Sequence, residues 1–204
     1  SIALVARNRP RVTSSNTVAG NACCGSGIGP TRIHKVVGVV KAYTTRVGGG
    51  PFPCELLDET GRHIQKVGGE FGATTGRPRR CGWLDMVVVN SSIRLNGLSG
   101  LVITKLDVLT GLPTLRIATK YRCGSHELAS VPPEIKALEA CEPVYEELPG
   151  WEEDIRSVRR FGDLPANTRR YLQAIEDLAS TPLNLVSVGP GRDETIILQH
   201  PFVV

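Results

Sequence analysis

The chain has 204 residues, of which 41% are hydrophobic and 22% charged, and its formal net charge is +4. This composition is typical of a globular protein, and the mild charge with 5% aromatic residues argues against a nucleic-acid-binding surface. The sequence has no apolar run long enough to span a bilayer, so we expect no membrane partner. Residues 1–11 lack the apolar core and cleavage site of a secretion signal, which predicts a cytoplasmic protein.

The cysteine pattern predicts thiols rather than a disulfide or metal framework. The six cysteines are Cys23, Cys24, Cys54, Cys81, Cys123 and Cys141. They form no Cys-x-x-Cys pair and the four histidines are scattered, so the ligand spacing of a zinc site is missing. Because a chain of this length can build a core without disulfides, we expect reduced and mostly buried thiols, and no metal site.

In chain order, the residues first predict a loop and a helix. Residues 12–30 are rich in Ser, Thr, Gly and Asn, which is typical of a loop. Apolar residues between 33 and 40 recur at helical spacing and favour a helix that the glycines of 48–51 would end. Residues 51–69 look irregular, with one short strand near 62–66.

The remaining residues predict an α/β fold. Helices are expected at 83–95 and 165–178, because apolar residues share one face and Pro165 suits a first turn. Short apolar runs between turn signals predict strands at 100–104, 115–121, 183–188 and 195–198, and residues 123–150 read as an excursion on the surface. Alternating strands and helices indicate a mainly parallel sheet flanked by helices.

Residues 69–83, with the sequence GEFGATTGRPRRCGW, combine the groups that an anion-binding loop needs. Glycines allow close approach of the backbone, hydroxyls donate hydrogen bonds, and arginines present planar forks that suit carboxylate and phosphate. These residues are Gly72, Gly76, Thr74, Thr75, Arg77, Arg79 and Arg80.

Two short segments follow predicted strands, where ligands bind in α/β sheets. In Thr104-Lys105-Leu106-Asp107, the Asp could accept two hydrogen bonds from guanine and the Lys stem could lie along the purine. A solvated strand end would explain these four residues equally well. The segment 187–192 could contact the same base, and a simple Gly-Pro turn is the alternative. The hydroxyl-rich residues 12–17 suit phosphate oxygens or a plain turn.

Together these segments resemble a known family. Residues 12–16, 41–48, 69–83, 104–109, 143–151 and 187–192 occur in the order found in the C-terminal half of adenylosuccinate synthases. The segments GATTGRPRR and TKLDVL carry most of the specificity. The resemblance covers residues 12–204 and leaves 1–11 as a divergent N-terminal segment. It implies the C-terminal portion of a P-loop NTPase-like synthetase fold that lacks the phosphate-loop half.

The resemblance also implies an activity in the AMP branch of purine biosynthesis. The family ligates IMP and L-aspartate to adenylosuccinate with GTP and Mg²⁺, and a homodimer is expected. GTP phosphorylates the 6-oxygen of IMP, and the aspartate amine then displaces that phosphate.

Site residues are implied position by position. The IMP contacts are Thr13, Val47 and Arg77. The aspartate loop is Ala73, Thr74, Thr75, Gly76, Arg77, Pro78 and Arg79. The GTP contacts are Arg79, Lys105, Leu106, Asp107, Ser187, Val188 and Gly189.

The sequence departs from the family in one respect, because it has no Gly-rich phosphate loop followed by Lys. The resemblance places the catalytic Asp and His and the Mg²⁺ ligands in an N-terminal half outside these residues, so no catalytic residue is assigned here. We expect a fragment, a truncated product or a divergent paralogue that is inactive alone and prone to self-association. The alternative is a non-catalytic nucleotide-binding or dimerisation module derived from the synthase.

Overall fold

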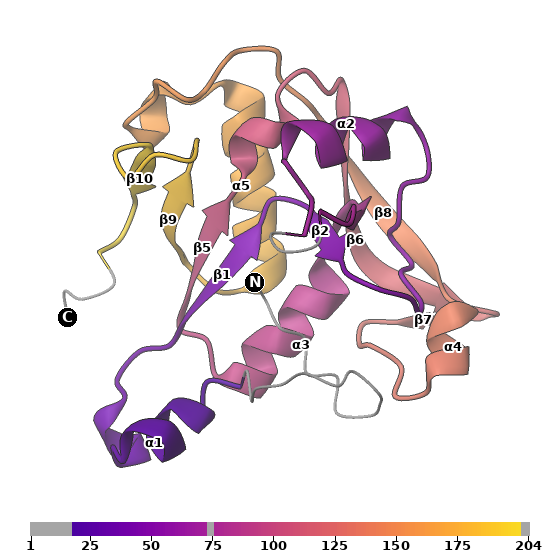
Figure 1. Cartoon of the computed structure of the whole chain (residues 1–204), viewed down its shortest axis with the longest axis vertical. Coiled ribbons are helices and arrows are strands. Elements are labelled where there is room, and N and C mark those ends of the chain that lie inside the picture. The colour runs from indigo at the N-terminus through magenta and orange to yellow at the C-terminus, as the bar shows by residue number, and fades with distance from the viewer. Residues whose placement is uncertain (1–17, 73–75, 201–204) are drawn as a thin grey trace.

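The computed structural model describes residues 18–72 and 76–200. Among these residues the central sheet has four strands in the order β1-β5-β9-β10 (Figure 1). The strands β1 (Val37–Lys41), β5 (Gly100–Thr104) and β9 (Leu183–Ser187) run parallel, and β10 (Thr195–Ile197) is antiparallel at one edge. The α/β class with a mainly parallel central sheet is therefore confirmed.

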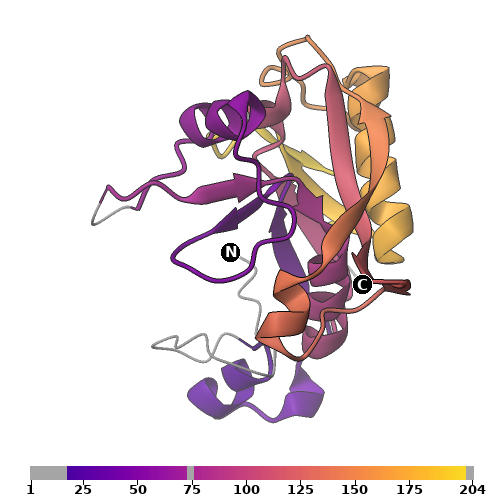
Figure 2. The same cartoon turned by 90° about the vertical axis from the view of Figure 1, so that its right-hand side faces the viewer.

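Two long helices lie beside this sheet and pack against each other. The helix α5 (Ala166–Ala179) lies behind the sheet in Figure 1 and to one side of it in Figure 2. Its Leu172 and Ile175 are fully buried in the same core as Leu101 and Ile103 of β5. The helix α3 (Met86–Asn96) begins where Asp85 accepts a hydrogen bond from the Val88 backbone N–H, and ends at Gly97. Both helices occur where the sequence predicts them.

A second sheet lies beside the first. The strand β6 (Thr114–Cys123) pairs with β8 (Glu142–Pro149) in antiparallel register along its length, with β7 (His126–Leu128) pairing its end. The two-residue β4 (Leu84–Asp85) pairs with β6 in parallel. The prediction that 123–150 form a surface excursion is therefore wrong over 142–149, because β8 is part of this sheet. A short helix α4 (Ile135–Glu139) lies in the connection before it.

Two other predicted elements are wrong. Residues 37–41 form strand β1 rather than a helix, since the valines are branched at Cβ and pair in register with β5 from Gly100 to Thr104. Residues 62–66 lie in helix α2 (Glu59–Val67) rather than a strand. Asp58 starts that helix by accepting a hydrogen bond from the Gly61 backbone N–H at 3.0 Å, and Ile64 is buried under it.

Smaller elements complete the described chain. The helix α1 (Asn21–Ser26) and the turn η1 (Pro30–Arg32) bury no residue and lie apart from the main body in Figures 1 and 2. The helix α1 lies within the predicted loop 12–30, so that prediction is wrong over 21–26, and η1 begins at the last residue of the predicted loop. A two-stranded ribbon joins β2 (Thr44–Arg46) and β3 (Arg80–Gly82), and the turns η2 (Leu106–Leu109) and η3 (Phe161–Asp163) follow β5 and precede α5. None of the helices in 18–72 and 76–200 is long and apolar enough to cross a membrane.

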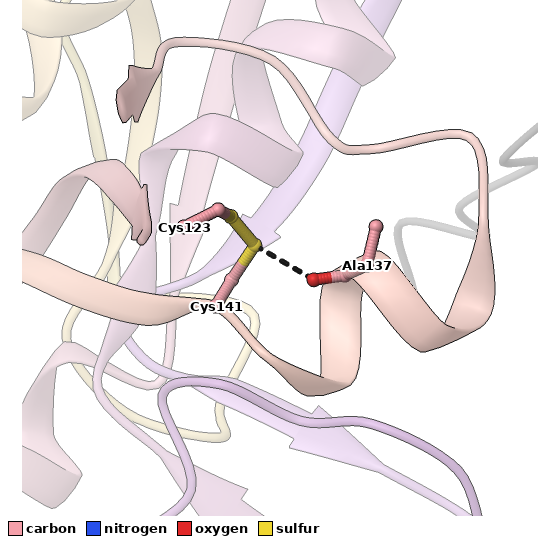
Figure 3. Close-up of a disulfide and its surroundings, with 3 residues drawn as sticks. All are labelled: Cys123, Ala137 and Cys141. Carbon is pink, nitrogen blue, oxygen red and sulfur yellow. Dashed lines mark hydrogen bonds between the residues drawn. A yellow bond between two sulfur atoms is a disulfide. The ribbon is translucent and has the colours of Figure 1, made fainter. Parts of the chain in front are cut away.

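The expectation of six reduced thiols is wrong for one pair. Cys123 at the end of β6 and Cys141 just before β8 form a disulfide, with their Cα atoms 4.5 Å apart (Figure 3). The antiparallel pairing of β6 with β8 brings these two positions together. The sequence spacing of 18 residues alone does not reveal that proximity. Cys23, Cys24, Cys54 and Cys81 are free thiols.

The disulfide is expected to stabilise the second sheet. A bond closing a loop of 18 residues should contribute about 3 kcal/mol by restricting the unfolded chain. Urea unfolding of the wild type with and without dithiothreitol should show this loss, whereas a Cys123→Ser/Cys141→Ser double variant should be insensitive to the reductant. Maleimide labelling of six thiols in urea without reductant would contradict the bond.

Candidate functional site

Polar residues gather at the carboxyl edge of the three parallel strands. Lys41 ends β1 opposite Thr104, which ends β5. The next strand is in similar register, because Ile103 of β5 pairs with Val186 of β9. The chain therefore leaves β5 at Lys105 and β9 at Ser187 on one edge of the sheet. The two predicted guanine-binding segments, 105–107 and 187–189, are brought together there.

The segment after β5 has an unusual backbone. Lys105 has a left-handed conformation with φ of 62°, and its Nζ donates a hydrogen bond to the Gly68 carbonyl at 2.9 Å. Leu106 is fully buried, so only its backbone could contact a ligand. Asp107 is half-buried; burial raises the pKa of its carboxyl, while the Asp107 backbone N–H and the charges of Lys105 and Arg156 act in the opposite direction.

The segment after β9 is a compact turn. Ser187 Oγ donates a hydrogen bond to the Gly189 carbonyl at 2.7 Å, and the Val188 N–H donates to the Glu194 carbonyl at 2.9 Å. Val188 is fully buried. A Cβ at Gly189 would lie 2.5 Å from the Glu194 carboxylate, so a larger residue would displace the end of that side chain.

A buried carboxylate that the sequence analysis did not select lies beside this edge. Glu70 Oε1 accepts hydrogen bonds from Lys41 Nζ and Tyr43 Oη, both at 2.6 Å, and Oε2 accepts one from Arg79 Nη1 at 3.0 Å. Burial alone would raise the pKa of Glu70, but the three donors together lower it below its usual value. Burial and the neighbouring Glu70 raise the pKa of Tyr43, so it remains a neutral donor.

A cavity of about 260 Å³ opens next to Glu70. Its lining combines polar side chains of β1, β2 and Arg79 with apolar side chains of β1, β4 and α3. The lining residues are Val40, Lys41, Tyr43, Thr44, Thr45, Val47, Arg79, Leu84, Val88 and Val89. Two predicted substrate residues, Val47 and Arg79, are thus brought to one cavity. Its volume is near the lower end for ligand pockets and fits part of a nucleotide.

The predicted anion loop is held at its base. The Arg79 N–H donates a hydrogen bond to the Glu70 carbonyl at 2.9 Å, and the Gly72 N–H donates to the Arg77 carbonyl at 2.8 Å. Gly76 has a φ of 63°. Arg77 and Pro78 are exposed, and the ribbon on either side of 73–75 extends away from the body in Figure 2. The predicted contacts Thr13, Ala73, Thr74 and Thr75 lie outside the described residues.

Arg80 has a different place from the other arginines of that segment. Its guanidinium forms a two-point ion pair with Glu55 and donates to the Gly50 carbonyl at 2.8 Å. Arg46 donates to the Pro51 carbonyl at 2.9 Å from the other side of the same loop. These bonds fix residues 48–51 beside Val47, which is 71% exposed at the cavity. Arg80 therefore shapes the site rather than offering its fork to an anion.

Sequence reasoning missed Lys41, Tyr43 and Glu70. Assigning 33–40 to a helix hid the first two, since a strand ending at Lys41 would have placed them at the ligand-binding edge. Glu70 carried a usable signal, because an acidic residue beside three arginines suggests a partner that orients them.

Comparisons with known proteins point to one family. The sequence model of the adenylosuccinate synthetase family matches residues 7–196. The adenylosuccinate synthetase of Syntrophobacter fumaroxidans is 75% identical over 193 residues, and that of Desulfatibacillum aliphaticivorans is 60% identical; each alignment covers 95% of this chain but 45% of the relative. The structure of the fully ligated Plasmodium falciparum adenylosuccinate synthetase superimposes with a TM-score of 0.89 at 41% identity, covering 93% of this chain and 46% of that one. The chain thus spans about half the length of these relatives.

The Glu70 cluster predicts a loss of stability in acid. The pKa of Glu70 is lowered in the folded state, so its contribution is complete above the unfolded value and disappears as the pH falls through the folded value. Glu70→Gln should cost about 1–3 kcal/mol at pH 7, and the difference from wild type should shrink below about pH 4.5. Urea unfolding between pH 3 and pH 7 measures this.

Glu127→Gln is the matched control, because Glu127 is also ion-paired, with Lys120, but is exposed on β7. Its pH dependence should stay close to wild type. A difference between wild type and Glu70→Gln that does not change with pH would contradict the ionised state of Glu70.

Proposed function

Because this chain belongs to the adenylosuccinate synthetase family, we propose that it supplies the guanine site, the aspartate loop and part of the IMP site of a GTP-dependent ligation of IMP and L-aspartate. The observation that carries the proposal is the meeting of the ends of β1, β5 and β9 at one edge. At the same edge, Lys41 at the end of β1 lines a cavity together with Val47 and Arg79, two of the predicted substrate residues.

The guanine site has suitable chemistry. A carboxylate at Asp107 can accept hydrogen bonds from the N1–H and the amino group of guanine, a donor pair that adenine lacks. Lys105 can lay its alkyl stem along the base, because its ammonium is held at the Gly68 carbonyl. Leu106, Val188 and Gly189 would contribute backbone groups, and Ser187 its hydroxyl or backbone.

In the aspartate loop, two guanidinium groups would bind the two carboxylates of the L-aspartate substrate. Arg79 faces the cavity and Arg77 lies on the exposed part of the loop. Loop closure would bring Arg77 and residues 73–78 over the aspartate and would exclude water from the phosphorylated IMP intermediate. Val47 would contact the IMP ribose, Thr13 its phosphate, and Arg79 would also reach GTP.

A magnesium ion would neutralise phosphate charge in such a reaction. In the ranges 18–72 and 76–200, no group of three His, Cys, Asp or Glu side chains could hold a metal ion. The described residues therefore hold no such cluster of side chains for Mg²⁺. We propose that the metal ligands and the catalytic Asp and His belong to the part of the relatives' length that this chain does not span.

Assembly and location complete the proposal. We propose a cytoplasmic homodimer, with residues 12–204 as the substrate-binding part and 1–11 as a separate segment. Val39 is 45% exposed on β1, an edge strand among the described residues, which supports self-association. Against the cytoplasmic location stands the disulfide Cys123–Cys141, because disulfides are rare in cytoplasmic proteins. The alternative function is a non-catalytic nucleotide-binding or dimerisation module derived from the synthase.

Guanine recognition is expected to depend on Asp107. Calorimetric titration should show that the chain binds GDP in preference to ADP, and that Asp107→Ala weakens GDP binding by about 100-fold because two charge-assisted hydrogen bonds are lost. Asp177→Ala, which removes an exposed carboxylate on α5, should leave the affinity unchanged. Equal affinity for GDP and ADP would contradict the guanine site, and dimerisation without nucleotide binding would favour the dimerisation module.

The chain by itself is expected to be inactive. Phosphoryl transfer depends on positioning and on neutralising phosphate charge, and the described residues offer no metal site for this. A coupled spectroscopic assay for adenylosuccinate with the purified chain, GTP, IMP, L-aspartate and Mg²⁺ should remain at background. Turnover well above background would show that these residues contain a complete active site.

A further inference from the structure

Two cations from separate elements meet on one buried carboxylate at the cavity wall. Lys41 ends β1 and Arg79 closes the base of the loop, 38 positions later in the sequence. Their ammonium and guanidinium groups lie 2.6 and 3.0 Å from opposite oxygens of Glu70, whose side chain is 2% exposed. Both cations also line the cavity, so Glu70 holds them side by side there.

The charges of this trio do not cancel. Two positive groups face one carboxylate, which leaves one net positive charge in a cavity that apolar residues of β4 and α3 also line. Arg79 Nε is buried and has no hydrogen-bond acceptor among the described residues. A buried donor without an acceptor is costly. Anionic oxygens that enter the cavity would neutralise the remaining charge.

The backbone at Gly68 packs against the cluster of Lys41, Arg79 and Glu70. Lys105 holds the Gly68 carbonyl at 2.9 Å, and a Cβ at this glycine would clash with the Tyr43 hydroxyl, which is itself the third donor to Glu70. The position of Glu70 is thereby fixed relative to the guanine edge. A carboxylate held this firmly can fix the rotamers of the cations that it binds.

We propose that Glu70 is a positioning residue that aligns Lys41 and Arg79 as a paired anion site, and that Lys41 contacts the same phosphate or carboxylate group as Arg79. The identity of the anion rests on the proposed function: it is a phosphate of IMP or GTP, or a carboxylate of L-aspartate. The alignment itself depends only on the geometry of the three side chains.

The first test measures the alignment without any ligand. In ¹H–¹⁵N spectra of arginine Nε–H groups, the wild-type chain should give a separate, slowly exchanging Arg79 signal, assigned by its loss in Arg79→Lys. Glu70→Gln should move this signal into the averaged envelope, and Glu70→Asp should retain it in part. Glu127→Gln, which removes an exposed ion-paired carboxylate on β7, should leave it unchanged. An unaltered Arg79 signal in Glu70→Gln would overturn the proposal.

The second test titrates IMP, GDP and L-aspartate separately by calorimetry and so identifies the source of the anion. Lys41→Met and Glu70→Gln should each weaken the same ligand by about tenfold, as expected for the loss of one charge-assisted contact. Glu70→Asp should recover part of the affinity. Unchanged affinities in both Lys41→Met and Glu70→Gln would overturn the shared site.

Failure of the proposed function is distinguishable from failure of this inference. If the wild type binds none of the three ligands, the proposed function fails, while the Arg79 spectrum still decides the alignment. If Glu70→Gln does not fold by circular dichroism, Glu70→Asp and Lys41→Met decide: an Arg79 signal unaltered in Glu70→Asp, with wild-type affinity in Lys41→Met, would overturn the proposal.

Discussion

The parallel pairing of β1, β5 and β9 is the constraint on which the candidate site depends. Parallel neighbours end at the same edge, so Lys41, Lys105 and Ser187 emerge together although they lie far apart in the sequence. Core packing fixes this arrangement, because Leu101 and Ile103 of β5 are buried against α5. A one-residue shift of β5 would expose that apolar face, so the same packing that stabilises the sheet also fixes the positions of the polar residues.

Glu70 adds an electrostatic constraint to that edge. A carboxylate whose side chain is 2% exposed is stable as an anion only because Lys41, Tyr43 and Arg79 donate to it. The same contacts tie the base of the anion loop to the end of β1, while Lys105 ties the guanine edge to Gly68. The proposed base recognition and anion binding would therefore share one rigid support.

The sequence predicted the elements whose signals are local. The helix α5 and the strands β5 and β9 appear within a few residues of their expected bounds, since each has a clear apolar face or run between turn signals. The strand β1 was missed because its valines fit a helical period as well as a strand, and only pairing with β5 decides between them. The disulfide and β8 depend on contacts between distant residues, which no local pattern encodes.

The sequence predicted part of the candidate site, namely the residues that follow strand ends. The chemistry of residues 105–107 and 187–189 and their common edge followed from strand ends, but the burial of Leu106 and Val188, which leaves only backbone groups for a ligand, did not. Arg80 looked equivalent to Arg79 in the sequence, yet its pairing with Glu55 assigns it to the loop at 48–51. Neighbours in space, rather than residue type, separate the two arginines.

The central claim is that the joined ends of β5 and β9 form a guanine site. Backbone ¹H–¹⁵N spectra of the chain during titration with GDP, and in parallel with ADP, test it most directly. The account predicts the largest shifts at residues 105–107 and 187–189 with GDP and much smaller ones with ADP. Shifts confined to other residues, or the same shifts with both nucleotides, would contradict it.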